Sequence, residues 1–225
     1  MKKFSYDISK YRFIELLERL FICTDLSQTH TVLPNHITYS TRFNNKNDNR
    51  TWFHEKFYHK INNYWKEFDE QYLAFVKKEI SPHFKDEIIF QSNPTFRIHM
   101  PNNVAVGKGD QTAGFHRDSD PGYNHPLAEF NIFLPLTKAF ESNTIWVESE
   151  TGKEDYSPME ASPGEYYLWK GTQLSHGNKV NTTNSSRISF DFRVLQKTDY
   201  KPESFSSTAD RNKKFAIGQY YREFK

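Results

Sequence analysis

The sequence has few of the features that mark a secreted, membrane-bound or nucleic-acid-binding protein. It holds one cysteine, Cys23, among 225 residues, so no disulfide forms within the chain. Residues 1–13 lack the apolar run of a signal peptide or membrane span, and we expect a cytoplasmic protein. Thirty basic residues nearly balance 28 acidic ones, without a basic block. The charge pattern therefore indicates neither a nucleic-acid nor a membrane partner.

Apolar residues make up only 36% of the chain, but 20 Phe, 13 Tyr and 4 Trp supply large apolar surfaces. An aromatic side chain buries about 150–250 Å², so a substantial core is possible. The length suits one domain, residues 1–225. We expect mostly helical support over 1–85, a jelly-roll core over 86–198 and a C-terminal tail over 199–225.

The N-terminal part shows helical periodicity. Residues 13–22, FIELLERLFI, place their apolar side chains on one stripe and predict a helix. Residues 41–50 are polar and predict a loop. From Phe53 to Val76, apolar residues recur mostly at spacings of three and four, which predicts one long amphipathic helix ended by Ser81-Pro82. We expect its aromatic stripe to pack against a sheet.

After residue 86 the pattern changes to short runs rich in aromatic and β-branched residues, separated by Gly, Pro, Asn and Asp. Such runs predict strands, and their regular spacing predicts a sandwich or barrel such as a jelly roll. The predicted strands cover 87–92, 95–100, 127–136, 143–149, 165–170 and 187–195.

A candidate metal site begins in GFHRDSD, residues 114–120. His116 and Asp118 are two apart, so on an extended strand both side chains point to one face. The pair alone is a weak signal, because most such pairs lie on surfaces. His176, which follows an aromatic strand and the Gly171 turn, supplies a second imidazole. Two imidazoles and one carboxylate on one face of a metal leave three positions open, a set that suits Fe(II) with a bidentate co-substrate and O₂.

Strict alternation in RISFDFRV, residues 187–194, gives that strand an apolar and a polar face. On an ordinary sandwich the polar face would meet water. In a barrel it can line the interior, where Arg187 can bind a carboxylate through two parallel hydrogen bonds and Ser189 can add a third. Arg193 shares this face and is the second candidate for the carboxylate anchor.

The order of these residues resembles that of the 2-oxoglutarate- and Fe(II)-dependent oxygenases. Within them the chain is similar to the phytanoyl-CoA-hydroxylase-like branch, and there to the StrG-like proteins of streptomycin-type aminoglycoside pathways. The resemblance covers residues 113–195, with TFRIHMPNN as a plausible upstream part. It is carried by GFHRDSD, EFNIFLPLTKAFESNTIWVESETG, PGEYYLWKGTQLSHG and RISFDFRVL.

The resemblance implies a mainly β fold, a double-stranded β-helix (jelly roll, cupin-like) with N-terminal helices packed on one side. It implies that His116, Asp118 and His176 bind Fe(II), and that Arg187 and Ser189 bind the distal carboxylate of 2-oxoglutarate. The expected activity is hydroxylation or further oxidation of a small molecule, with 2-oxoglutarate and O₂ as co-substrates. A sugar, an aminoglycoside-type molecule or another biosynthetic intermediate is the expected substrate class.

Further candidates each have an ordinary structural alternative. Asn131, on a mostly apolar strand, could bind the co-substrate or be a satisfied core amide. Arg97 could bind a substrate or co-substrate anion, or form a surface ion pair. Trp146 could stack on a sugar or simply pack in the core. His99 and His125 are reserve metal ligands that we interpret as ordinary polar histidines.

Two other functions remain open. A cupin-type metal isomerase, lyase or O₂-only dioxygenase would use the same His, Asp and His ligands without 2-oxoglutarate, and would not need Arg187 with Ser189. A non-catalytic jelly-roll module that binds sugars would need none of the three metal ligands. Metal content separates this last alternative from both enzymes.

Overall fold

Two antiparallel sheets form the body of the molecule. The computed structural model describes residues 1–32, 51–104, 114–201 and 214–224, so the predicted loop at 41–50 lies outside the described residues. The large sheet has the strand order β1–β7–β4–β9–β2–β10, with β3 also paired to β9. The small sheet has the order β6–β5–β8. The arrangement is a jelly roll, as the strand pattern predicted.

The strand bounds agree with all six predicted runs. The large sheet contains β1 (Lys2–Ser5), β2 (Ile88–Gln91), β3 (Thr95–His99), β4 (Phe130–Pro135), β7 (Glu165–Trp169), β9 (Arg187–Gln196) and β10 (Tyr221–Arg222). The small sheet contains β5 (Ile145–Val147), β6 (Ser157–Pro158) and β8 (His176–Asn178). The short strands β1, β6, β8 and β10 were not predicted. Because β1 and β10 join the large sheet, the N-terminal support and the C-terminal tail each contribute a strand to it.

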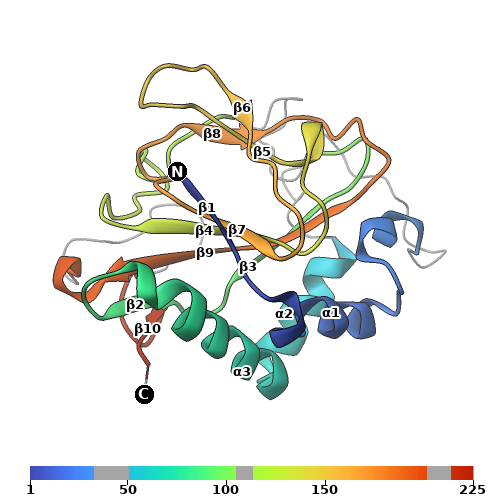
Figure 1. Ribbon diagram of the computed structural model, residues 1–225, viewed down its shortest axis with the longest axis horizontal. Coiled ribbons are helices and arrows are strands. Elements are labelled where there is room, and N and C mark those ends of the chain that lie inside the picture. Colours follow the sequence, from blue (N-terminus) through green and yellow to red (C-terminus); the bar gives the residue numbers. More distant parts are fainter. Residues whose placement is uncertain (33–50, 105–113, 202–213, 225) are drawn as a thin grey trace.

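Helices cover the face of the large sheet that lies away from the small sheet (Figure 1). They are α1 (Phe13–Phe21), α2 (Trp52–Asn62) and α3 (Lys66–Phe75), which continues into a π-helical turn at Val76–Ile80. Single 3₁₀ segments lie at Ile8–Lys10, Leu26–Thr31, Ser81–His83, Glu141–Asn143 and Lys197–Asp199. Among the described residues no helix is long and apolar enough to cross a membrane.

The single helix predicted over 53–76 is wrong, because the chain breaks between α2 and α3. Tyr64 adopts a left-handed φ of 58° and is 71% exposed. Trp65 is buried instead and stacks on Phe68, with ring centroids 5.3 Å apart. Because of this break, α2 and α3 both direct their aromatic side chains toward the large sheet.

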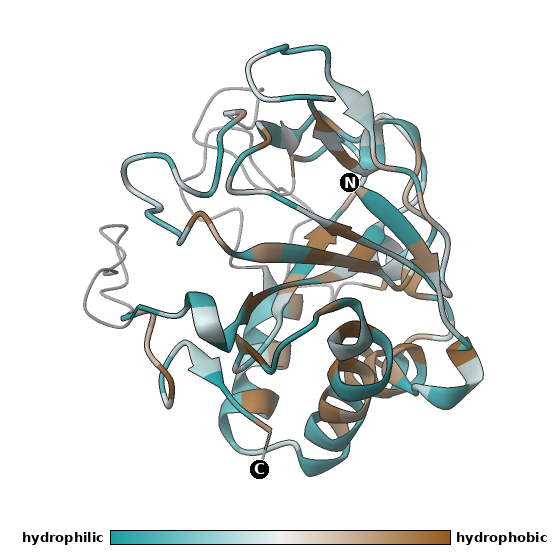
Figure 2. Ribbon diagram, turned by 60° about the vertical axis from the view of Figure 1, so that its left-hand side comes forward, coloured by the Kyte–Doolittle hydropathy of each residue, from teal (hydrophilic) through white to brown (hydrophobic). Residues whose placement is uncertain are grey.

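The two faces of β9 differ as the alternation predicted. Phe190 lies 5.7 Å from Phe13, 5.5 Å from Phe57 and 5.3 Å from Phe68, measured between ring centroids. Phe192 meets Tyr72 edge to face at 5.2 Å. In Figure 2 apolar segments gather on the central strands and on the helices beneath them, with hydrophilic loops outside. The apolar face of β9 therefore fixes the helices, and its polar face turns toward the small sheet.

A smaller apolar core lies between the two sheets. Its buried residues are Phe133, Ala139, Ile145, Val147, Met159 and Trp169. The C-terminal tail packs back on the large sheet, where Phe215 and Tyr221 form a third cluster with Ile89 and Leu195. The core between the sheets fills only part of that space, and the remainder is the pocket described below.

Candidate metal centre

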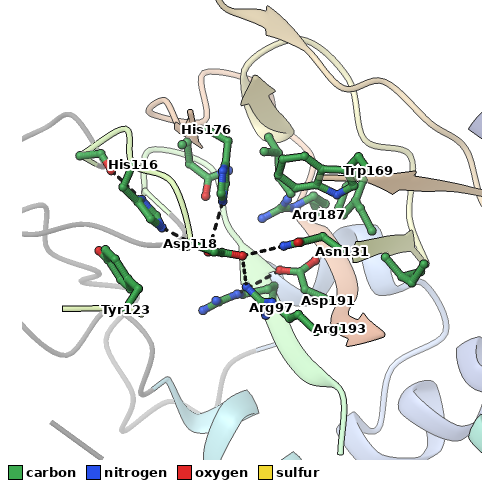
Figure 3. Close-up of a pocket in the computed structure, with 16 residues that line it drawn as sticks. Arg97, His116, Asp118, Tyr123, Asn131, Trp169, His176, Arg187, Asp191 and Arg193 are labelled. Carbon is green, nitrogen blue, oxygen red and sulfur yellow. Dashed lines mark hydrogen bonds and ion pairs between the residues drawn. The ribbon is translucent and has the colours of Figure 1, made fainter. Parts of the chain in front are cut away.

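Three predicted metal ligands meet at one end of the space between the sheets (Figure 3). His116 and His176 face each other across an antiparallel bridge, with backbone N–H to O distances of 3.0 and 2.9 Å. Asp118 donates its backbone N–H to the Gly171 carbonyl at 2.9 Å. The Nε2 atoms of both histidines lie 3.7 Å from Asp118 Oδ1. One ligand atom from each residue lies within 4.8 Å of the others, so a single ion can contact all three.

Both imidazoles present the nitrogen that a metal needs. His116 Nδ1 lies 2.9 Å from the Gly114 carbonyl, and His176 Nδ1 lies 3.0 Å from the Leu174 carbonyl. A carbonyl only accepts hydrogen bonds, so each Nδ1 carries the proton and each Nε2 keeps its lone pair. Burial lowers the pKa of His176 to about 4, which keeps its imidazole neutral at pH 7. The two imidazoles are thus prepared to bind a cation.

The carboxylate of Asp118 is held on its other oxygen. Oδ2 accepts hydrogen bonds from Asn131 Nδ2 at 2.7 Å and from Arg193 Nη2 at 2.9 Å. Burial favours a raised pKa for Asp118, but the Arg193 guanidinium holds this pKa well below its usual range. Asp118 is therefore ionised at neutral pH, with Oδ1 directed at the two imidazoles.

A cavity open to solvent adjoins these residues. Besides the three candidate ligands it is lined by Arg97, Tyr123, Trp169, Arg187 and Asp191, among others. The cavity therefore extends from the candidate metal ligands to the polar face of β9.

Arg187 forms no ion pair within 4 Å with any described residue. Its side chain is 1% exposed, and its Nε and Nη1 atoms are buried without a hydrogen-bond partner among the described residues. Burial lowers the pKa of Arg187 to about 10, so the guanidinium still carries its charge at pH 7. Ser189, two residues along the same face, is fully buried, and its Oγ also has no partner in the described part of the chain. Buried charges in folded proteins are paired, and a carboxylate is the ligand that these two side chains would accept.

Asn131 and Arg193 are both close to the candidate metal ligands, but neither points at Arg187. The sequence left Asn131 open as a co-substrate contact or a satisfied core amide, and Arg193 as the reserve carboxylate anchor. In the structure both donate to Asp118 Oδ2. The Asn131 amide is oriented by a backbone hydrogen bond, because its Oδ1 accepts from Gly171 N–H at 3.2 Å. The position of Arg193 leaves Arg187 as the candidate carboxylate anchor.

The substrate candidates Arg97 and Trp146 lie in different places. Arg97 lines the pocket, and its Nε donates to Asp191 Oδ2 at 3.2 Å. Trp146 is not among the lining residues, because Ile145 and Val147 on either side of it turn inward to the apolar core. Its Nε1 donates to the Glu141 carbonyl at 3.1 Å, and Lys179 Nζ lies 3.2 Å from its ring centroid.

The two reserve histidines lie outside the cluster. His99 is buried, with one ring nitrogen 3.0 Å from the Asn143 carbonyl and the other 2.8 Å from the Asn103 carbonyl. His125 Nδ1 lies 2.7 Å from Glu129 Oε2. Both nitrogens of His99 are thus used for structural contacts, and neither histidine belongs to the group of potential metal ligands.

Two pocket aromatics were missed from the sequence. Trp169 meets His176 edge to face at 4.7 Å, and its Nε1 is buried without a partner among the described residues. Tyr123 stacks on His116 at 4.3 Å. Alternation in β7 could have placed Trp169 on the interior face opposite Tyr166 and Leu168. The position of Tyr123 depends on the turn after Pro121, which periodicity does not predict.

Comparisons with known proteins gave one close sequence relative. The chain is 33% identical over 174 residues to the streptomycin biosynthesis protein StrG of Streptomyces griseus, and the match covers 77% of each chain. No protein-family model matches the sequence.

Similar solved structures superpose only loosely. The non-heme monooxygenase ThoJ in its nickel complex has a TM-score of 0.41 and 11% identity, over 85% of this chain and 71% of that chain. AviO1 from Streptomyces viridochromogenes has a TM-score of 0.41 and 14% identity, over 86% of both chains. The alpha-ketoglutarate-dependent carbocyclase SnoK from nogalamycin biosynthesis has a TM-score of 0.36 and 11% identity, over 49% of this chain and 52% of that chain. At these low scores, the fold assignment rests on the strand order of the present chain.

Proposed function

This chain belongs to the StrG family, and we propose that it is an Fe(II)- and 2-oxoglutarate-dependent oxygenase that acts on a small biosynthetic intermediate. The observation that carries the proposal is the buried guanidinium of Arg187, whose Nε and Nη1 have no hydrogen-bond partner among the described residues, in the same cavity as His116, Asp118 and His176. A metal site alone would fit several classes of enzyme. A carboxylate anchor beside it fits a co-substrate with two acidic ends.

The ligand set matches Fe(II) chemistry. Two imidazoles and one ionised carboxylate would hold the ion and leave coordination positions for a bidentate keto acid and for O₂. Iron bound there would activate O₂ for oxidation of a substrate C–H bond, coupled to decarboxylation of 2-oxoglutarate to succinate and CO₂. This chain contributes a fixed Nε2 from each histidine and an ionised Asp118 with one oxygen already occupied.

Arg187 and Ser189 would bind the distal carboxylate of 2-oxoglutarate. The guanidinium offers two buried N–H donors, and the Ser189 hydroxyl offers a third hydrogen bond. Phe133 packs beside the guanidinium, with its ring centroid 5.5 Å away, and helps keep water from it. In such surroundings a hydrogen bond between charged groups is stronger than in water.

The rest of the cavity would receive the substrate. Arg97, Asp191 and Tyr123 line it and are polar contacts for a hydroxylated or charged molecule. The name of the StrG relative places that protein in streptomycin biosynthesis, which supports a sugar or aminoglycoside-type substrate for this chain. Trp146 is not among the residues that line this cavity, so we leave it out of the proposed substrate site.

The test is an anaerobic titration of the metal-free protein with Fe(II) and then with 2-oxoglutarate. We expect a visible metal-to-ligand charge-transfer band that grows with 2-oxoglutarate and saturates. Iron binding without this band would support a cupin-type enzyme that does not use 2-oxoglutarate. Absence of iron binding would contradict both enzyme assignments and support a non-catalytic jelly-roll module.

A further inference from the structure

We propose that Asn131 and Arg193 are positioning residues that hold Asp118 as a metal ligand through one oxygen only. This inference rests on the proposed function, because it requires Asp118 to bind the metal. It assigns to both residues a role different from co-substrate binding.

The two donors form a matched pair on neighbouring strands. Asn131 on β4 lies directly opposite Arg193 on β9 in the antiparallel register, so both side chains leave the same face of the large sheet. They donate to the same atom, Asp118 Oδ2, at 2.7 and 2.9 Å. The other oxygen, Oδ1, lies 3.7 Å from the Nε2 atoms of both histidines. Each carboxylate oxygen therefore has a separate set of neighbours.

Gly171 fixes the direction of the Asn131 amide. Its backbone N–H donates to Asn131 Oδ1 at 3.2 Å, so the amide nitrogen must point at Asp118. Its carbonyl accepts the backbone N–H of Asp118 at 2.9 Å. A Cβ at position 171 would come within 2.5 Å of Asn131 Nδ2 and 2.8 Å of its Cγ. Only glycine lets this turn approach Asn131 so closely.

The histidines and the aspartate are positioned in different ways. Each histidine donates Nδ1–H to a carbonyl two residues before it, at Gly114 or Leu174, so its orientation is set within its own segment. Asp118 instead depends on the large sheet, through the Asn131–Arg193 pair. Without that pair its carboxylate could rotate or chelate the ion through both oxygens, which would use a coordination position needed by the co-substrate or by O₂.

The experiment measures Mn(II) affinity in the absence of 2-oxoglutarate for the wild type, Arg193→Met, Arg193→Lys, Asn131→Leu and Gly171→Ala. Arg222→Met is the matched control, since it removes a half-buried guanidinium that pairs with Asp69 and does not line the cavity. Loss of such an outer partner typically weakens metal binding by about 10- to 100-fold. We expect a change of that size for Arg193→Met and Asn131→Leu, partial recovery for Arg193→Lys, and a smaller loss for Gly171→Ala.

The visible spectrum of the Co(II)-loaded proteins gives a second measurement, because it reports the number of ligands. Its bands should change in Arg193→Met and Asn131→Leu but not in Arg222→Met. Unchanged Mn(II) affinity and Co(II) spectra in folded Arg193 and Asn131 variants would overturn the positioning role and leave the proposed function intact. Equal losses in the Arg222→Met control would also overturn it. Failure of the wild type to bind any metal would overturn both proposals, so the two failures are distinguishable.

Discussion

The two faces of β9 show how one strand serves both folding and function. On one face Ile188, Phe190, Phe192 and Val194 are buried against the helices and the neighbouring strands, with aromatic rings in contact on several sides. On the other face Arg187, Ser189, Asp191 and Arg193 each keep at least one buried polar atom without a partner among the described residues. The backbone is shared, and only the side-chain environment differs.

The apolar side chains of β9 stabilise the fold, whereas Arg187 and Ser189 on the polar face have buried polar atoms that are available to a ligand. Burial of apolar side chains is a favourable contribution to folding. Burial of a charge without a partner is unfavourable, and replacing such a group by an apolar one of similar size is often neutral or stabilising. Substitutions on the apolar face should therefore change stability, whereas substitutions of Arg187 and Ser189 on the polar face should change ligand binding.

The largest expected effect comes from removing a metal ligand. In His176→Ala, metal binding and turnover should be lost together, because only His116 and Asp118 remain to hold the ion. The variant should still unfold cooperatively, since the helix-facing core is untouched. Calorimetric titration with Mn(II) and thermal unfolding followed by circular dichroism measure the two properties. Wild-type metal affinity in the folded variant would contradict the ligand assignment.

On the opposite face of β9, Phe190→Ala should lower the free energy of unfolding by about 3–5 kcal/mol. Its ring is 1% exposed and packs against three helix aromatics, so truncation leaves a cavity at the centre of the core. Urea unfolding measures the change. If the variant folds, its Mn(II) affinity should equal that of the wild type. Loss of metal binding without loss of stability would contradict the assignment of this face to folding alone.

Ser189 precedes Phe190 in β9 and lies on the polar face. Ser189→Ala is therefore the matched substitution on that face. Loss of one hydrogen bond is worth about 0.5–1.5 kcal/mol, so 2-oxoglutarate affinity should fall by roughly two- to tenfold. Stability should not decrease, because the hydroxyl removed is buried and has no partner among the described residues. Calorimetry measures the 2-oxoglutarate affinity, and urea unfolding of the same sample measures the stability. A destabilised variant with normal affinity would show that Ser189 serves the fold and does not bind 2-oxoglutarate.

The smallest effect is expected for Trp146→Ala. The indole lies outside the cavity, donating to Glu141 and contacting Lys179, so the affinities for metal and 2-oxoglutarate should stay within about twofold of wild type. The KM for a substrate, once one is found, should also be unchanged. A marked rise in that KM would return Trp146 to the substrate site.

Short runs rich in aromatic and β-branched residues were the most reliable guide in this sequence, because they predicted six of the ten described strands. Alternation predicted both faces of β9, since burial of one face forces a period of two. β6 and β10, with two residues each, are too short to show a pattern, and β8 (His-Gly-Asn) contains no Phe, Tyr, Trp or β-branched residue. The break at Tyr64 was missed because it depends on how Trp65 packs against Phe68, a contact that helical spacing does not encode.

In the candidate site, the sequence predicted the metal ligands better than it predicted the hydrogen-bond partners of the other polar residues. The ligand set followed from spacing and from the resemblance, and the structure brings its three members together. The contacts of Asn131 and Arg193 depend on the register between β4 and β9 and on the close approach of Gly171. Those are tertiary relationships, so sequence alone left both residues as candidates for the co-substrate.

The most direct test of the central claim compares two keto acids on the wild type and on Arg187→Met. The Mn(II)-loaded proteins are titrated by calorimetry with 2-oxoglutarate and with 2-oxobutyrate, which keeps the keto acid end but lacks the distal carboxylate. Truncating a buried charge pair costs about 2–5 kcal/mol, so the wild type should prefer 2-oxoglutarate by about 30-fold or more. Arg187→Met should bind the two acids alike. If Arg187→Met keeps the wild-type preference, Arg187 does not bind the distal carboxylate and the account of the polar face of β9 is wrong.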